Sequence, residues 1–122
     1  MVNSELQFWK NKRVLITGHT GFKGSWLMIW LKELGAEIFG FSLKPDQNTK
    51  LFNSIPKDYF SNKIHNYFGD IRDKKYLDHC INEVQPEIVF HLAAQPLVKR
   101  SYLEPILTWE TNLIGSLNLL DV

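Results

Sequence analysis

The sequence predicts an α/β fold in which a doubly wound parallel sheet carries helices on both faces. Three observations favour this fold. Short apolar segments of strand length alternate along the chain with amphipathic helical segments. A glycine-rich turn stands between the first strand and the first helix, and the order β-α-β-loop-β-α-β-α is that of right-handed crossovers. At 122 residues the chain has room for one core, and we expect the sheet to stop after its fourth strand and the helix that follows.

The first two strands and the helix between them form one βαβ unit. Arg13–Thr17 is an apolar, β-branched run that breaks at Gly18, which indicates a strand buried on both faces. A helix follows, with Gly35 as its C-cap, and Glu37–Phe41 predicts the second strand. The helix is expected to bury one apolar face, made of Trp26, Leu27, Trp30, Leu31 and Leu34.

Two more strands around a second helix complete the predicted sheet. Leu43–Pro56 contains Pro, Asn and Asp without periodicity, so we expect a long loop with no more than one helical turn. Ile64–Phe68 predicts the third strand and Glu87–His91 the fourth. Between them, Asp73 is a good N-cap for a helix that ends at Pro86. The apolar face of this helix is formed by Tyr76, Leu77, Cys80, Ile81 and Val84.

A last helix is predicted to begin near Glu104 or Pro105. It has too many apolar residues for one buried stripe, so we expect the sheet to cover one face and a partner, or further residues of the same chain, to cover another. Trp109 is interpreted as a packing residue, like Trp26 and Trp30. The apolar residues of the last helix are Ile106, Leu107, Trp109, Leu113, Ile114, Leu117, Leu119 and Leu120.

Composition excludes several classes of partner. Lys and Arg number 14 against 13 Asp and Glu, and the net charge of +1 indicates neither a nucleic-acid nor a membrane-surface binder. The densest apolar run, Trp26–Leu31, is far too short to cross a membrane, and the polar start, Met1–Asn11, does not favour secretion. The single cysteine, Cys80, cannot form an internal disulfide, and the four histidines show no metal-ligand spacing. We therefore expect no metal site and a reducing, cytoplasmic location.

The strongest functional signal is the segment Thr17–Gly24, TGHTGFKG, which has the spacing G-x-x-G-x-x-G. Gly18 can make a tight turn, Gly21 lets the backbone approach a pyrophosphate, and Gly24 lets the helix pack closely on the strand. The helix N-terminus then offers free N–H groups to the anion. Because strand, turn, helix and second strand all stand where the motif requires them, the sequence predicts a nucleotide cofactor.

This turn resembles that of the extended short-chain dehydrogenase/reductase superfamily. Three further segments match recurring motifs of the superfamily in the same order, namely Gly69–Asp73 (GDIRD), His91–Gln95 (HLAAQ) and Thr111–Gly115 (TNLIG). Within the superfamily, the wording TGHTGFKG and AAQPLV resembles the CDP-glucose 4,6-dehydratase family, because relatives more often have TGxxGFIG and AAxxxV. The resemblance runs from Phe8 to the last residue and covers the N-terminal third of a typical family member.

The resemblance implies a Rossmann-type domain that binds NAD in an enzyme acting on a CDP-sugar. In the family reaction, hydride leaves C4 of the glucose of CDP-glucose, water is eliminated across C5 and C6, and the hydride returns to C6. The product, CDP-4-keto-6-deoxyglucose, feeds the deoxysugars of bacterial surface polysaccharides. The resemblance also implies a homodimer through the last helix.

The same resemblance assigns some of these 122 residues to cofactor binding and none of them to catalysis. The family's catalytic Tyr-Lys segment and its sugar-nucleotide-binding domain are expected to lie outside this chain, so we expect no turnover by the chain alone. The implied cofactor-binding residues are Gly18, Gly21, Phe22, Lys23 and Gly24 at the pyrophosphate, Asp70 and Ile71 at the adenine, Leu92, Ala93, Ala94 and Gln95 at the nicotinamide ribose, together with Ser42 and Thr111.

One departure concerns the adenosine ribose. A carboxylate near the end of the second strand normally binds this ribose, but here Phe41 is followed by Ser42, Leu43 and Lys44. Ser42 can hydrogen-bond the ribose hydroxyls, whereas Lys44 suits a 2′-phosphate. The residues therefore leave NAD and NADP open, and the resemblance favours NAD.

A formal match to the superfamily's catalytic Tyr-x-x-x-Lys is present at Tyr59–Lys63. It falls between the second and third strands, in a segment without a helical stripe. The chemistry needs both side chains one helical turn apart beside the nicotinamide, so we reject this match as a catalytic pair.

Two alternative functions fit the same cofactor motifs. A related NAD-dependent epimerase, or a dehydratase for another sugar nucleotide, would share the cofactor loops and differ in the residues that follow. A dinucleotide-sensing module without chemistry would also share them. No residue of this chain can be assigned to the sugar, so the substrate rests on the resemblance.

Overall fold

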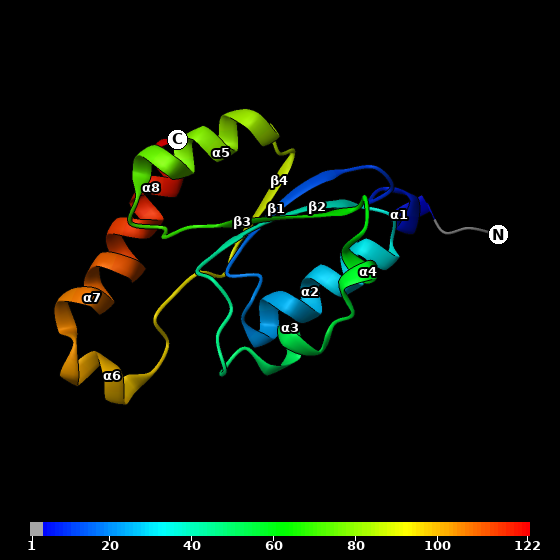
Figure 1. Cartoon of the computed structure of the whole chain (residues 1–122). Helices are drawn as coiled ribbons and strands as arrows, with labels where there is room; N and C mark the ends of the chain where they lie inside the picture. Colours follow the sequence, from blue (N-terminus) through cyan, green and yellow to red (C-terminus); the bar gives the residue numbers. More distant parts are fainter. Residues whose placement is uncertain (1–3) are drawn as a thin grey trace.

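Four parallel strands form the centre of the molecule (Figure 1). The computed structural model describes residues 4–122; residues 1–3, which begin the polar segment expected not to direct secretion, lie outside the described residues. The strand order is β3-β2-β1-β4 and each neighbouring pair is parallel, which confirms the predicted sheet. The strands are β1 (Arg13–Thr17), β2 (Glu37–Ser42), β3 (Ile64–Phe68) and β4 (Ile88–His91).

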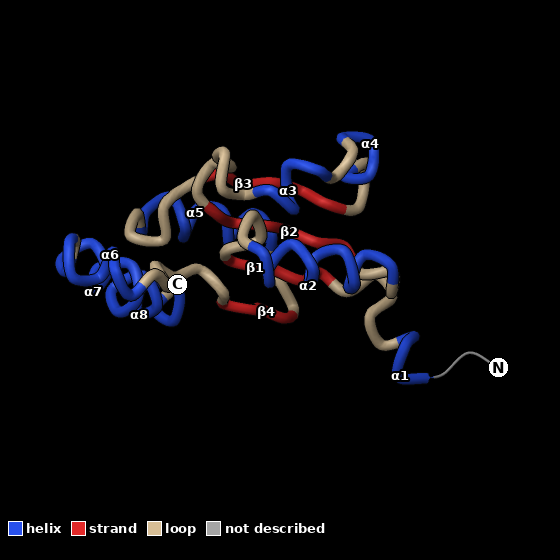
Figure 2. The backbone as a smooth tube through the Cα atoms, turned by 90° about the horizontal axis from the view of Figure 1, so that it is seen from below, coloured by secondary structure: helices blue, strands red, loops and turns tan. Residues whose placement is uncertain are grey.

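Helices lie on both faces of this sheet, as Figure 1 shows. Figure 2, which is turned by 90° from the view of Figure 1, shows the last helical segment beyond the carboxyl ends of the strands. No helix within residues 4–122 is long and apolar enough to cross a membrane. The helices are α1 (Ser4–Gln7), α2 (Phe22–Glu33), α3 (Lys50–Ser54), α4 (Lys57–Phe60), α5 (Lys74–Val84), α6 (Val98–Leu103), α7 (Pro105–Trp109), the π-helix η1 (Glu110–Ile114) and α8 (Gly115–Asp121).

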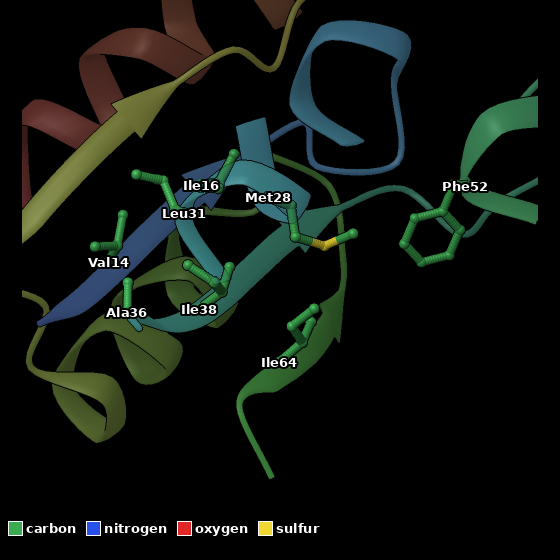
Figure 3. Packing of buried hydrophobic residues seen from close by; sticks show 8 residues of the cluster. All are labelled: Val14, Ile16, Met28, Leu31, Ala36, Ile38, Phe52 and Ile64. Carbon is green, nitrogen blue, oxygen red and sulfur yellow. The ribbon is translucent and has the colours of Figure 1, made fainter. Parts of the chain in front are cut away.

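Alternate residues of the strands enter two separate cores. Val14 and Ile16 of β1 join a cluster that includes Met28 of α2 and Phe52 of α3, which Figure 3 shows from close by. Leu15 joins a second cluster, formed with residues of α5 on the opposite face. Because successive strand side chains point to opposite faces, burial on both faces makes β1 apolar throughout, and the doubly wound arrangement follows.

The buried face of α2 differs from the predicted one. Trp26 and Trp30 are 54% and 66% exposed, and Trp109 of α7 is 65% exposed, so within the described chain these residues do not pack on the sheet. The helix also begins at Phe22, one turn earlier than the apolar stripe indicates, and its buried residues are Gly24, Ser25, Met28 and Leu31. Small residues at the start of α2 allow its backbone to lie close to the sheet, and this close approach turns the tryptophans outward.

The predicted loop Leu43–Pro56 holds one short helix, α3, as expected, and a second short helix, α4, follows before β3. The Tyr59–Lys63 match lies here and does not share a helix, because α4 ends at Phe60 and Ser61 has a φ of +30°. The Tyr59 hydroxyl donates to Glu33 Oε1 at 2.7 Å, and Lys63 Nζ donates to Asn11 Oδ1 at 3.2 Å. The two side chains therefore serve separate partners, and the rejection of this pair is confirmed.

Helix α5 forms as predicted. Asp73 Oδ1 accepts the N–H of Tyr76 at 3.1 Å and caps the helix, while Leu77, Cys80 and Val84 are buried. Periodicity and a capping side chain are local signals, and here they agree with the packing against β1 and β2.

The chain after β4 is more helical than predicted. A helix does begin at Pro105, but α6 precedes it, and the π-helix η1 interrupts the run before α8. Leu119 packs on the core cluster of α5, and Gly115 lies against Ile71. The large apolar residues that stay exposed on α7, η1 and α8 are Ile106, Trp109, Leu113, Ile114, Leu117 and Leu120.

Candidate functional site

The turn after β1 has a backbone that only glycine fits at two points. Gly18 has a φ of +78° and donates its N–H to the carbonyl of Phe41 at 2.8 Å. A Cβ on Gly18 would lie 2.8 Å from the backbone of Leu92 and Ala93, so the turn touches the loop after β4. A Cβ on Gly24 would lie 2.1 Å from the Gly18 carbonyl oxygen. Gly18 therefore allows the turn to contact the loop after β4, and Gly24 allows the start of α2 to lie against the turn.

The second glycine is the least crowded of the three. A Cβ on Gly21 would meet only the Gly18 carbonyl oxygen, at 3.3 Å, within 4 Å. Gly21 is the N-cap of α2 and lacks a side-chain cap, and no acceptor within residues 4–122 takes the N–H groups of Phe22, Lys23 or Gly24. Open space at a helix N-terminus with unpaired N–H groups and a nearby lysine fits an anion such as a pyrophosphate.

Ser42, at the end of β2, is joined to the same turn. Its hydroxyl shares a hydrogen bond of 2.7 Å with Thr20, and both residues are buried. The next two residues, Leu43 and Lys44, are exposed. The structure thus brings the predicted ribose-binding hydroxyl beside the glycine turn, with Lys44 in solvent.

Asp70 and Ile71 follow β3 at the same edge of the sheet. The Arg72 guanidinium donates to both carboxylate oxygens of Asp70, at 2.6 to 3.1 Å, and lowers the pKa of this carboxyl below its usual value. The Ile71 side chain is 5% exposed and packs against Gly115 of α8. Asp70 therefore stays ionised beside the site, whereas the Ile71 side chain belongs to the core.

A row of hydrogen bonds joins the ends of β1 and β4. Thr17 is fully buried opposite His91, and its Oγ1 lies 2.6 Å from His91 Nδ1. The same Oγ1 accepts the N–H groups of Leu92 at 3.0 Å and Ala93 at 3.1 Å. On the other side of the imidazole, Nε2 lies 2.8 Å from Ser116 Oγ, and burial lowers the pKa of His91.

The end of this loop is held by the last helix. Gln95 donates its N–H to Asn112 Oδ1 at 2.7 Å, and its carbonyl accepts from Asn112 Nδ2 at 3.1 Å. The Gln95 side chain is 7% exposed and bonds Leu97 and Thr108. Thr111 is half-buried next to Asn112 in η1. The Gln95 amide, predicted at the nicotinamide ribose, is thus already engaged within the chain.

His19, inside the glycine turn, is a buried packing residue. Its ring lies between Phe52 and Phe68, and Nε2 is 2.7 Å from Asn66 Oδ1. Burial lowers the pKa of His19 from 6.5 to about 4, so the ring is neutral at pH 7. Its Nδ1 has no hydrogen-bond partner in the described chain and lies over the backbone of Gly40.

The predicted site residues thus gather at the carboxyl edge of the sheet, where ligands of such sheets bind. Sequence reasoning missed Ser116, and it interpreted Thr20, His91 and Asn112 only as parts of motifs. Polar residues within otherwise apolar elements were the available signal, but their partners are 17 to 25 residues away and could not be read from local spacing.

Comparisons with known proteins place this geometry among sugar-nucleotide enzymes. The family model described as GDP-mannose 4,6 dehydratase matches residues 15–122. A CDP-glucose 4,6-dehydratase of Salmonella typhimurium is 48% identical over 114 residues, covering 93% of this chain and 31% of that protein. The chain therefore spans about a third of the length of the curated relatives it matches.

Two solved structures show the same arrangement of elements. An epimerase from Methanothermobacter thermautotrophicus superimposes with a TM-score of 0.81 at 29% identity and covers 97% of this chain and 33% of its own. A Thermus thermophilus UDP-glucose 4-epimerase, solved in complex with NAD, has a TM-score of 0.73 at 34% identity and covers 89% of this chain and 32% of its own.

Proposed function

Because the chain belongs to the family of GDP-mannose 4,6 dehydratases, we propose that it forms the NAD-binding part of a nucleotide-sugar dehydratase. The observation that carries this proposal is the open, unpaired N-terminus of α2 above Gly21. A solved relative, the Thermus thermophilus epimerase, is a complex with NAD, which supports NAD as the cofactor. Bound NAD would supply reversible uptake of a hydride from the sugar.

The residues present fit a dinucleotide. In this proposal the N–H groups of Phe22, Lys23 and Gly24 bind the pyrophosphate, and Gly18 and Gly21 allow its approach. The remaining cofactor-binding residues are Ser42 at the adenosine ribose, Asp70 and Ile71 at the adenine, and Leu92, Ala93, Ala94, Gln95 and Thr111 toward the nicotinamide.

The chain's own contribution at this site is orientation. The loop after β4 lies against Gly18, so the two walls of the site are fixed relative to each other. The Ile71 side chain is buried, and the side-chain and backbone groups of Gln95 are bonded inside the chain, so we assign to these two residues contact with the cofactor and not hydrogen bonds to it. A preformed site of this kind binds without first ordering its loops.

The proposed substrate is CDP-glucose, converted to CDP-4-keto-6-deoxyglucose. The similarity to the Salmonella CDP-glucose 4,6-dehydratase supports this choice, while the family model and the epimerase structures support the alternative of another sugar nucleotide. Product analysis of the enzyme that carries this chain, with CDP-glucose, GDP-mannose and UDP-glucose supplied in turn, distinguishes them. Dehydration of GDP-mannose alone, or epimerisation of UDP-glucose, would contradict the CDP-glucose proposal.

The proposal also includes the oligomeric state, the cellular location and the pathway of the enzyme. The exposed apolar residues of α7, η1 and α8 support a homodimer through this segment, and the single buried thiol of Cys80 suits a reducing cytoplasm. The pathway proposed is deoxysugar synthesis for a bacterial surface polysaccharide. We expect residues 1–122 alone not to dehydrate CDP-glucose, and turnover above a control with cofactor only would contradict this.

Calorimetric titration of the chain with NAD and, in parallel, with NADP tests cofactor binding. We expect saturable NAD binding that is lost in Gly21→Val, whose side chain fills the space above the turn. Asn82→Val, at an exposed position of α5, is the matched control and should bind NAD like the parent chain. Circular dichroism of each variant checks folding. Preference for NADP, or unchanged NAD binding by folded Gly21→Val, would overturn the proposal.

A further inference from the structure

The hydroxyl of Thr17 determines where the proton on His91 lies. Thr17 Oγ1 accepts the N–H of Ala93 and shares the N–H of Leu92 with the Thr17 carbonyl oxygen, and a hydroxyl has two acceptor positions and one hydrogen. We assign its own hydrogen to His91 Nδ1, 2.6 Å away. Nδ1 accepts this bond, so the neutral imidazole carries its hydrogen on Nε2.

The Nε2 hydrogen extends the row to the last helix. It is donated to Ser116 Oγ at 2.8 Å, and the Ser116 hydroxyl donates in turn to the Asn112 carbonyl at 2.7 Å. Asn112 also binds both backbone groups of Gln95. The loop 92–95 is thus tied at its start through His91 and at its end through Asn112, and both ties lead to the segment η1–α8.

This assignment satisfies the donors and acceptors of the row together. Removing the Ser116 hydroxyl leaves Nε2 of the half-buried His91 without its partner, which is costly where water is scarce. The loop that the row holds contacts Gly18, so its position affects the distance between the two walls of the cofactor site.

We propose that Ser116 and Asn112 are positioning residues, which act through His91 and Gln95 to fix the loop 92–95 for the nicotinamide side of the cofactor. The inference rests on the proposed NAD-binding function and extends it to residues of the last helix that do not touch the glycine turn. The pyrophosphate and adenosine contacts lie on other segments, and Ser116 and Asn112 make no hydrogen bond to those segments.

Titrations of the chain with NAD and with ADP test the proposal, because ADP lacks the nicotinamide and its ribose. We expect Ser116→Ala to weaken NAD binding about three- to tenfold, the worth of one such hydrogen bond, and to change ADP binding less than about twofold. Ser116→Thr, which keeps the hydroxyl, should restore NAD binding. Ser54→Ala, which removes an equivalent hydroxyl bonded to Leu51 on α3, is the matched control. Equal weakening of NAD and ADP, or unchanged NAD binding, would overturn the proposal.

Two measurements on the ligand-free chain test the positioning without the cofactor. Nitrogen NMR of His91 should show a bare Nδ1 and a protonated Nε2, and amide exchange at Ala93 should become about three- to tenfold faster in Ser116→Ala. Protonated Nδ1 or unchanged exchange would overturn the positioning role. If the parent chain binds neither NAD nor ADP, the proposed function fails, and these two measurements still decide the role of Ser116.

Discussion

Lowering the pH from 7 to 5 should destabilise the chain through His19. The His19 side chain is fully buried, and burial lowers its pKa from 6.5 to about 4. Between these values the unfolded chain binds a proton that the folded chain excludes, so the free energy of unfolding falls as the pH falls, and this contribution vanishes above about pH 7. The difference in free energy of unfolding between pH 7 and pH 5 works out to about 2 kcal/mol.

Urea unfolding followed by tryptophan fluorescence at pH 7, 6 and 5 measures this effect. His19→Gln removes the titrating ring while its amide can still donate to Asn66, so the variant should lose about 2 kcal/mol less than the parent over this range. His79→Gln, at an exposed position of α5, is the matched control and should follow the parent. Parallel pH profiles of the parent and His19→Gln would refute the reasoning, because the buried ring would then accept a proton freely.

Three further outcomes follow from close contacts and burial. Gly24→Ala places a Cβ 2.1 Å from the Gly18 carbonyl oxygen and should cost about 3 kcal/mol in urea unfolding; a loss below about 1 kcal/mol would show that the turn relaxes. Gly40→Ala places a Cβ 2.2 Å from the His19 ring and should lower the free energy of unfolding by about 2 kcal/mol. In a background that already carries His19→Ala, most of this loss should disappear, because the ring is gone. Strictly additive losses in the double variant would contradict this contact. Cys80 is 2% exposed and burial raises the pKa of its thiol, so a disulfide reagent should label it only as urea unfolds the chain; rapid labelling of the native chain would contradict its burial.

Local pattern was sufficient for the sheet and for α5. The β-branched apolar run at 13–17 forms a strand with the predicted bounds, because a strand buried on both faces requires a nearly continuous apolar sequence, and residues 64–68 also form a strand with the predicted bounds. Asp73 caps α5 as predicted, since a cap depends on residues within one turn of itself.

The local sequence pattern did not predict which face of α2 packs on the sheet. The tryptophans of α2 belong to an apolar stripe, yet the face that packs on the sheet is rotated away from them and buries Gly24, Ser25 and Met28 together with Leu31 of the stripe. A stripe of large apolar residues indicates that this face of the helix is covered, but it does not show whether the sheet or another surface covers it. Helix α6 was missed because its residues are exposed and carry no periodic apolar face.

By itself, the sequence determined the α/β order, the glycine turn and the segments that meet at the carboxyl edge of the sheet. These features depend on backbone conformation and on strand burial, which neighbouring residues encode. The tertiary structure alone decided which polar groups pair across that edge. Thr17 and His91 are 74 positions apart, and Gln95 faces Asn112 only because the helical segment after α6 brings η1 back to the loop that follows β4. A hydrogen bond depends on distances of a few tenths of an ångström, and chain spacing over such separations contains no information at that scale.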